Sequence, residues 1–298
     1  MFTSSTAQTA PSSARLTSID KRSNISRREL IKEYIEPNIP VVLTDAARAW
    51  PAMGKITPAF LKDRYGRLTR EVQGASYTLA DYVDLMPAST PAQPLPYPFS
   101  LDMQQLMPEL LPELRPDIVY AKSDRLKHPL LPKMLLLNTT PYELFLGGNG
   151  ASFPYLHVDA LCLHTQITQL YGAKEFFMYS PDQAPYMYPR ADNGKVSQVK
   201  AFEPDYEQFP LFQHAKPLVF TVEEGETVLF PTGWWHTTKI HGPCISFGRS
   251  QLNAGNWNAF AQDHFALRKD KYRVFATAAL LYSRALGKVM DWQEASMG

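Results

Sequence analysis

Short apolar segments separated by turn residues fill the region from Tyr142 to Gln251, and they constrain the fold more than any other feature of the chain. The segments are about six to ten residues long, and Gly, Pro, Asp and Asn lie between them. Six of them read LCLHTQITQL, KEFFMYSP, PLVFTVEEG, ETVLFPTG, WWHTTKI and CISFGRSQ. Many short strands with regular turn signals are typical of antiparallel sheets in a sandwich or barrel. We therefore predict a mainly β fold for this region.

The first half of the chain mixes helical and strand patterns. SRRELIKEYIE begins with Ser26 and has Glu29 three residues later, which is the pattern of a capping box. TPAFLKDRYG places Thr57 before Pro58, a favourable helix start, and TLADYVDLM repeats the capping logic. IPVVLTD reads as a short buried strand. The proline-rich segment that follows these patterns reads as a long covering loop, with a short helix near DMQQLMPELL.

The pattern becomes helical again after Asn253. Apolar side chains recur there at steps of three and four residues, which indicates an amphipathic helix. These side chains are Tyr272, Phe275, Ala279, Tyr282, Leu286 and Met290. The stripe either packs on its own chain or pairs with a second copy across a two-fold axis. We predict the second arrangement, a homodimer.

Composition excludes several classes of protein. The chain has 298 residues and a formal net charge of +1, so no global charge favours nucleic acid or an anionic membrane as partner. The sequence contains no run of roughly 18 apolar residues, which is the length that would predict a membrane span. Two cysteines, Cys162 and Cys244, are too few for a disulfide framework. We therefore predict an intracellular, cytoplasmic protein and assign both cysteines to the core.

Two histidines and one carboxylate in the β region form a candidate metal site. His157 and Asp159 are two residues apart in SFPYLHVDALCLH, and side chains two apart in a strand face the same way. His236 follows 77 positions after Asp159, in WWHTTKI. A single histidine among aromatic residues is usually a core residue. Two histidines and one carboxylate on one face, however, suit non-haem Fe(II) oxygen chemistry. Lys174 lies among aromatic residues in KEFFMYSP, where an unpaired ammonium is costly, so a ligand carboxylate would stabilise it.

LHVDALCLHTQITQLYGAKEFFMYSP followed by GETVLFPTGWWHTTKI resembles the JmjC-domain, cupin-type 2-oxoglutarate oxygenases. The chain is most similar to their hydroxylase branch, which includes the asparaginyl hydroxylase that acts on hypoxia-inducible factor. The resemblance extends over roughly residues 39 to 253 and includes IPVVLTDAARAWPA. It implies a double-stranded β-helix (jelly-roll), Fe(II), 2-oxoglutarate as cosubstrate and a protein or peptide as substrate. By the same resemblance, His157, Asp159 and His236 match the iron ligands, and Lys174 matches the lysine that pairs with the distal carboxylate of 2-oxoglutarate.

The same resemblance assigns two further cosubstrate contacts and leaves two departures. Tyr120 matches a tyrosine that hydrogen-bonds the same carboxylate, and Leu146 matches an apolar wall of the pocket. Pro154 stands where the family usually has a threonine, and Ser250 stands where many relatives carry an asparagine. Three threonines could supply the missing hydroxyl: Thr139, Thr165 and Thr237. His164 and His241 lie outside the pattern and are interpreted as structural or surface residues.

We predict three parts of the chain: a disordered tail over residues 1–20, a JmjC/cupin-like catalytic domain over 21–253 with an N-terminal α/β decoration, and a C-terminal helical extension over 254–298. The tail is rich in Ser and Thr, and a targeting segment is the alternative reading. The predicted activity is hydroxylation of a protein or peptide side chain by a 2-oxoglutarate-dependent dioxygenase. The alternatives are an N-methyl-lysine demethylase with the same chemistry and a non-catalytic cupin that binds a small acid.

Overall fold

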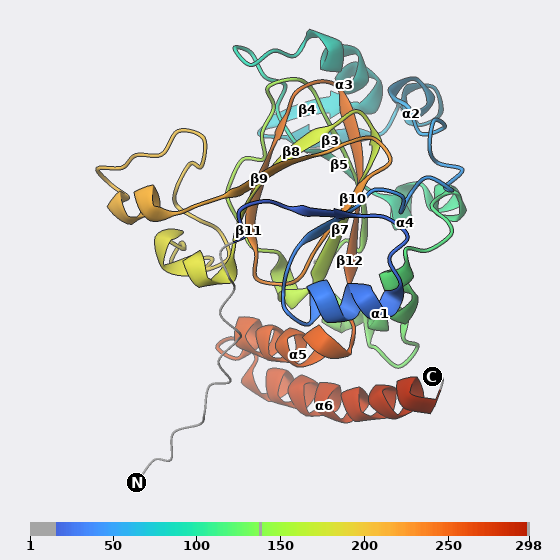
Figure 1. Cartoon of the computed structure of the whole chain (residues 1–298), viewed down its shortest axis with the longest axis vertical. Coiled ribbons are helices and arrows are strands. Elements are labelled where there is room, and N and C mark those ends of the chain that lie inside the picture. The colour runs from blue at the N-terminus through green and yellow to red at the C-terminus, as the bar shows by residue number, and fades with distance from the viewer. Residues whose placement is uncertain (1–15, 137–138, 297–298) are drawn as a thin grey trace.

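The computed structural model describes residues 16–136 and 139–296 of the chain (Figure 1). The tail predicted for residues 1–20 lies mostly outside the described residues, and its last residue, Asp20, opens the first strand. The predicted domain boundaries stay predictions. No helix in the described ranges is both long enough and apolar enough to cross a membrane.

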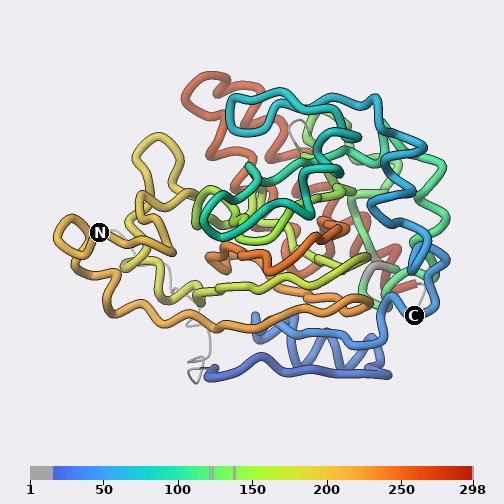
Figure 2. Tube along the Cα trace, turned by 90° about the horizontal axis from the view of Figure 1, so that it is seen from above, coloured from blue at the N-terminus to red at the C-terminus, as the bar shows by residue number. Residues whose placement is uncertain are grey.

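The centre of the molecule is made of two β-sheets. The larger sheet has seven strands in the order β1-β2-β10-β7-β12-β6-β5, and the smaller has three in the order β11-β8-β9. All neighbouring strands are antiparallel except the pair β1 and β2. The strands of the larger sheet, in chain order, are β1 (Asp20–Arg22), β2 (Val41–Leu43), β5 (Phe99–Asp102), β6 (Tyr142–Gly147), β7 (His164–Tyr171), β10 (Thr227–Phe230) and β12 (Cys244–Gln251). The smaller sheet contains β8 (Lys174–Tyr179), β9 (Leu218–Val222) and β11 (Trp235–Ile240), and Figure 2 follows β8 and β9 side by side.

Alternating side chains bury both faces of the larger sheet. Val42 and Val228 pack with Phe176 and Phe220 of the smaller sheet in one apolar cluster, so the two sheets face each other. The neighbouring residues on each strand, including Leu229, belong instead to the cluster under the N-terminal helices. This period of two is the expected pleat of a strand. The mainly β, jelly-roll prediction is confirmed, although among the described residues the two sheets do not close into one barrel.

The helices cover the outside of the sheets and begin where the sequence predicts. Ser26 and Glu29 form the predicted capping box, and Thr57 caps the next helix ahead of Pro58. A two-stranded ladder, β3 (Thr69–Val72) and β4 (Ala75–Thr78), leads into the third helix. The helices are α1 (Arg27–Leu30) with a π-helical turn (Ile31–Ile35), α2 (Pro58–Tyr65), α3 (Leu79–Leu85), α4 (Met103–Leu106), α5 (Ala254–Arg268) and α6 (Arg273–Ser296). Short 3₁₀ helices lie at Met86–Ala88, Pro108–Glu113, Val119–Ser123, Arg125–Lys127, Lys133–Leu136, Ala160–Cys162, Pro181–Tyr186 and Pro210–His214.

The helices α5 and α6 pack on each other at one end of the sheets (Figure 1). The stripe predicted for α6 is partly used there, because Ala279, Leu286 and Met290 are buried with Trp257 of α5. Other large apolar side chains remain exposed along α6, and Phe275 and Tyr282 among them belong to the predicted stripe: Val274, Phe275, Leu281, Tyr282, Val289 and Trp292. The homodimer stays a prediction.

Candidate metal centre

The two histidines of the candidate site meet through the backbone. His157 and His236 form an isolated antiparallel bridge in which each backbone N–H donates to the other residue's carbonyl, at 3.1 and 2.7 Å. His236 lies on β11, but His157 and Asp159 lie in the irregular segment before the 3₁₀ turn Ala160–Cys162. The prediction that His157 and Asp159 share a regular strand is therefore wrong. The bridge to β11, and not strand alternation, places them together.

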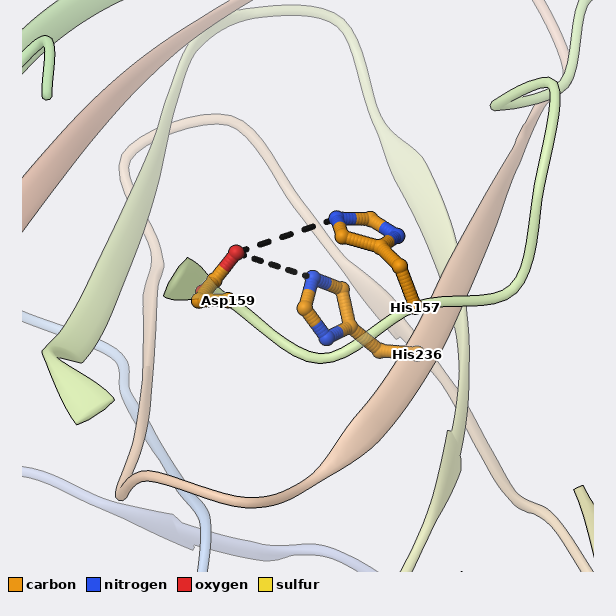
Figure 3. Close-up of side chains that lie close together, drawn as sticks. All are labelled: His157, Asp159 and His236. Carbon is orange, nitrogen blue, oxygen red and sulfur yellow. Dashed lines mark ion pairs between the residues drawn. The ribbon is translucent and has the colours of Figure 1, made fainter. Parts of the chain in front are cut away.

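The three polar side chains converge without hydrogen-bonding one another (Figure 3). Asp159 Oδ1 lies 3.7 Å from His157 Nε2 and 3.8 Å from His236 Nε2. These distances are too long for hydrogen bonds. One ligand atom from each residue lies within 4.8 Å of the others, a grouping that could hold a metal ion. Two imidazole nitrogens and one carboxylate are a donor set that suits Fe(II) or a related divalent metal.

Neighbouring groups fix the orientation of each ligand. The Nδ1 of His236 lies 3.0 Å from the Trp234 carbonyl, which assigns its proton to Nδ1 and leaves the Nε2 lone pair toward Asp159. The Thr165 hydroxyl donates to the other oxygen of Asp159. Outer partners of this kind hold metal ligands in place before the metal binds.

Aromatic rings shield the two histidines. Phe153 stacks on His157 with the ring centres 4.7 Å apart, and Phe230 lies 4.8 Å from His236. Burial and the neighbouring His236 lower the pKa of His157 to about 3, so this imidazole stays neutral near pH 7. Burial alone would raise the pKa of Asp159, but the two histidines and the Thr165 hydroxyl lower it below its ordinary value. A neutral imidazole and an ionised carboxylate are the forms that bind metal.

The three candidate ligands line a cavity that also contains a buried lysine side chain. The cavity has a volume of about 350 Å³, and its wall includes His157, Asp159, His236 and Lys174. Lys174 is only 2% exposed, and its Nζ donates to the Tyr97 hydroxyl at 2.8 Å. Within the described ranges its ammonium forms no ion pair with a carboxylate. Burial lowers the pKa of Lys174, and a bound anion would stabilise its charged form.

Lys174 and His236 lie at different positions along the ladder between β8 and β11. Lys174 pairs with Ile240, whereas His236 pairs with Met178, four residues along the same ladder. Four residues of strand span about 13 Å, and the lysine side chain crosses part of that distance. The metal ligands and the ammonium therefore enter one cavity from positions that are well separated along the ladder.

Two cosubstrate contacts suggested by the resemblance are not in this cavity. Tyr120 lines a separate cavity on the other face of β7, and Tyr97 takes the position beside Lys174. Leu146 is fully buried under the N-terminal helices, and its neighbour Phe145 forms the cavity wall instead. Both assignments of the sequence analysis are therefore corrected.

Three of the four hydroxyl candidates line the metal cavity. Thr165, Thr237 and Ser250 line the cavity, whereas Thr139 lies elsewhere and donates to the Leu136 carbonyl. Pro154 is exposed and does not line the cavity.

A further carboxylate of the cavity was not singled out from the sequence. Glu143 lines the cavity beside Phe145 on β6, and burial raises its pKa to about 7. The alternation of β6 could have indicated it, because Glu143 and Phe145 lie on the same face of that strand.

Comparison with known proteins places the chain in a family. Residues 71–249 match the Cupin-like domain. The chain is 27% identical over 256 residues to the lysine-specific demethylase JMJ21 of Arabidopsis thaliana, and the aligned region covers 82% of this chain and 26% of that protein. It is 26% identical over 127 residues to the HSPB1-associated protein 1 of Rattus norvegicus (41% of this chain, 25% of that protein). It is 26% identical over 235 residues to the human JmjC domain-containing protein 8 (74% of this chain, 78% of that protein).

The match to JMJ21 and to the HSPB1-associated protein spans only about a quarter of the length of each relative. Those names therefore describe longer proteins that share this domain. The family match itself extends over more than half of the chain and contains His157, Asp159, Lys174 and His236. The chain belongs to the cupin-like domain family, among relatives that are named as JmjC-domain proteins and demethylases.

Proposed function

We propose that this protein is an Fe(II)- and 2-oxoglutarate-dependent oxygenase that hydroxylates a side chain of a protein or peptide. The observation that carries the proposal is the shared cavity of the triad His157, Asp159, His236 and the buried Lys174. A metal site alone would fit many activities. Here the metal site shares its cavity with a buried ammonium that has no carboxylate partner in the part of the chain that the structure describes. This arrangement fits a small dicarboxylate that bridges the two.

Each residue has a separate role in the proposal. The triad holds the metal, with Thr165 and the Trp234 carbonyl fixing the ligand orientations. Lys174 and Tyr97 bind the distal carboxylate of 2-oxoglutarate, and the short reach of this pair selects for its length.

The shielding rings Phe153 and Phe230 restrict the access of water to the histidines. When bound, Fe(II) supplies the activation of dioxygen, which no protein side chain can provide. The overall reaction consumes the substrate C–H bond, O₂ and 2-oxoglutarate, and it yields the hydroxylated product, succinate and CO₂. No side chain is required as an acid or base.

An N-methyl-lysine demethylase is the second candidate, because JMJ21 is named a lysine-specific demethylase. The same reaction on an N-methyl group gives an unstable hydroxymethyl amine that releases formaldehyde. The two activities therefore differ in the carbon that is oxidised and agree in the use of the site.

The test incubates the protein with Fe(II), 2-oxoglutarate, O₂ and a peptide library, with and without methylated lysine. Succinate release coupled to a mass gain of one oxygen on an unmethylated peptide supports the hydroxylase. Formaldehyde with loss of a methyl group supports the demethylase. Binding of 2-oxoglutarate without succinate release, with every peptide, would leave the non-catalytic cupin as the function.

A further inference from the structure

Glu143 is a carboxylate of the metal cavity that has no role in the proposed reaction. Glu143 and Phe145 lie on the same face of β6, because side chains two apart on a strand point the same way. The centre of the Phe145 ring lies 5.6 Å from Lys174 Nζ, so this face of β6 is turned toward the cavity. Leu144, between them, is buried instead under the N-terminal helices. The side chain of Glu143 therefore enters the cavity.

The register of the larger sheet places Glu143 toward the metal end of the cavity. Gly248 of β12 pairs with Glu143 on one side and with Ile167 of β7 on the other. Two positions before Ile167, the Thr165 hydroxyl donates to the candidate ligand Asp159. The two carboxylates also influence each other, because burial chiefly, and with it neighbouring carboxylates that include Asp159, raises the pKa of Glu143 to about 7.

Tyr155 lies near Glu143 at the rim of the cavity. It lines the cavity and is 42% exposed, and its ring meets the ring of His157 edge-on with the centres 5.2 Å apart. Burial, and after it the charges of Glu143 and Asp159, raises the pKa of the Tyr155 hydroxyl, so both carboxylates are close to it. Glu143, Tyr155 and the metal ligands therefore face one part of the cavity.

Gly248 leaves room in the cavity beside Glu143. A Cβ atom at this position would lie 2.7 Å from Cε2 of Phe145 and 3.3 Å from Cδ1 of Ile167, and both of these residues line the cavity. The first distance is too short for two carbon atoms, so a side chain there would require the Phe145 ring to move. The glycine therefore keeps space open for another group next to the carboxylate.

No basic side chain of the described residues balances the charge of Glu143. Arg249 also lines the cavity, but its guanidinium is turned to the other face of β12 and donates to Asp117, outside this cavity, at 3.1 Å. With the proposed metal and cosubstrate bound, the charges of a divalent ion and Lys174 cancel those of Asp159 and the two carboxylates of 2-oxoglutarate. Glu143 is then left in the described part of the cavity as a carboxylate without a counter-charge, and such a group is costly to bury.

We propose that Glu143 and Tyr155 bind the positively charged side chain of a lysine or arginine residue, and that this residue is the substrate of the proposed oxygenase. The substrate class rests on that proposed function. A carboxylate forms charge-assisted hydrogen bonds with an ammonium or guanidinium group, and an aromatic ring attracts a cation. Because Tyr155 contacts the candidate ligand His157, a side chain held there lies beside the metal. A neutral side chain such as that of asparagine would leave the carboxylate without a counter-charge.

The test measures by fluorescence anisotropy how peptide mixtures bind to the full chain with Mn(II) and 2-oxoglutarate, without O₂. The mixtures share random flanking residues and differ in one fixed central residue, which is lysine, arginine or the apolar analogue norleucine. We expect the wild type to bind the lysine or the arginine mixture at least about tenfold more tightly than the norleucine mixture, because hydrogen bonds between charged groups are the stronger ones.

Variants assign this preference to the two residues. Glu143→Gln keeps the shape of the side chain and removes its charge, so the preference should fall to about twofold or less. Tyr155→Phe should keep the preference, whereas Tyr155→Leu should lower it about threefold through loss of the ring. Glu175→Gln is the matched control and should change nothing, because Glu175 lies next to Lys174 on β8 but contacts His241 at 2.9 Å, outside the cavity.

Equal affinities of the three mixtures for the wild type, no binding of any mixture, or an unchanged preference in Glu143→Gln would overturn the assignment. Calorimetric titration of the Mn(II)-loaded wild type with 2-oxoglutarate tests the proposed function separately. If 2-oxoglutarate binds and no preference for a basic residue appears, only the role of Glu143 is wrong. Absence of 2-oxoglutarate binding would instead contradict the proposed function.

Discussion

Replacement of Lys174 should separate stability from cosubstrate binding. The Lys174 side chain is almost fully buried, and among the described residues its ammonium donates one hydrogen bond, to a neutral hydroxyl. In the free protein the ammonium is therefore poorly compensated. Lys174→Met keeps a similar volume and removes the charge. Because replacing a poorly compensated buried charge by an apolar side chain is often neutral or stabilising, we expect the free energy of unfolding of the metal-free variant to stay equal or rise.

Cosubstrate binding should change in the opposite direction. Loss of one partner of a buried charge pair costs about 3–5 kcal/mol, which corresponds to a decrease in 2-oxoglutarate affinity of roughly a hundredfold or more. The assay combines thermal unfolding without metal and calorimetric titration of 2-oxoglutarate with a bound divalent metal. Lys239→Ala serves as a control, because Lys239 lies on the neighbouring strand β11 and stacks on Phe202 outside the cavity. A variant that unfolds more easily yet binds 2-oxoglutarate as tightly as the wild type would refute the reasoning.

Three further changes test the cavity. Tyr97→Phe should lower 2-oxoglutarate affinity about tenfold, through loss of a hydrogen bond to a charged group, whereas Tyr120→Phe should leave it unchanged; calorimetry with both variants compares them directly. Thr165→Val should lower metal affinity by roughly 10- to 100-fold, as measured by competition with a chelator, because the Asp159 carboxylate loses the donor that orients it. Finally, since burial lowers the pKa of Lys174 below 10.5, 2-oxoglutarate affinity should fall by up to about tenfold per pH unit above that lowered pKa. The neutral amine must then gain a proton before it pairs, and Lys174→Ala should lack this alkaline loss of affinity in titrations across the pH range.

The parts of the site that could be predicted from the sequence are those with a local signature. His236 and Lys174 lie on strands that the alternation of apolar residues indicates, and His157 and Asp159 form a short motif. The helix start at Ser26 could also be predicted from a local signal, because a capping box depends on two residues that are three positions apart.

The parts that could not be predicted depend on strand pairing and register. Tyr97 lies two residues before β5, and β5 pairs with β6. The proline-rich sequence around Tyr97 gives no pattern that indicates this pairing, so its contact with Lys174 could not be predicted. Leu146 and Phe145 differ by one position, and one position on a strand exchanges the core face for the cavity face. Tyr120 had no flanking strand pattern that fixed its place, and the structure puts it in a different cavity.

Metal content is the most direct measure of the central claim that His157, Asp159 and His236 form one metal site. The measurement loads the purified protein anaerobically with Fe(II), removes unbound metal and determines iron per chain by mass spectrometry. We predict one iron per chain for the wild type and for His241→Ala, a surface histidine that contacts Glu175, and strongly reduced iron for His157→Ala, Asp159→Ala and His236→Ala. Equal iron in the wild type and in a variant that lacks all three ligands would contradict the account.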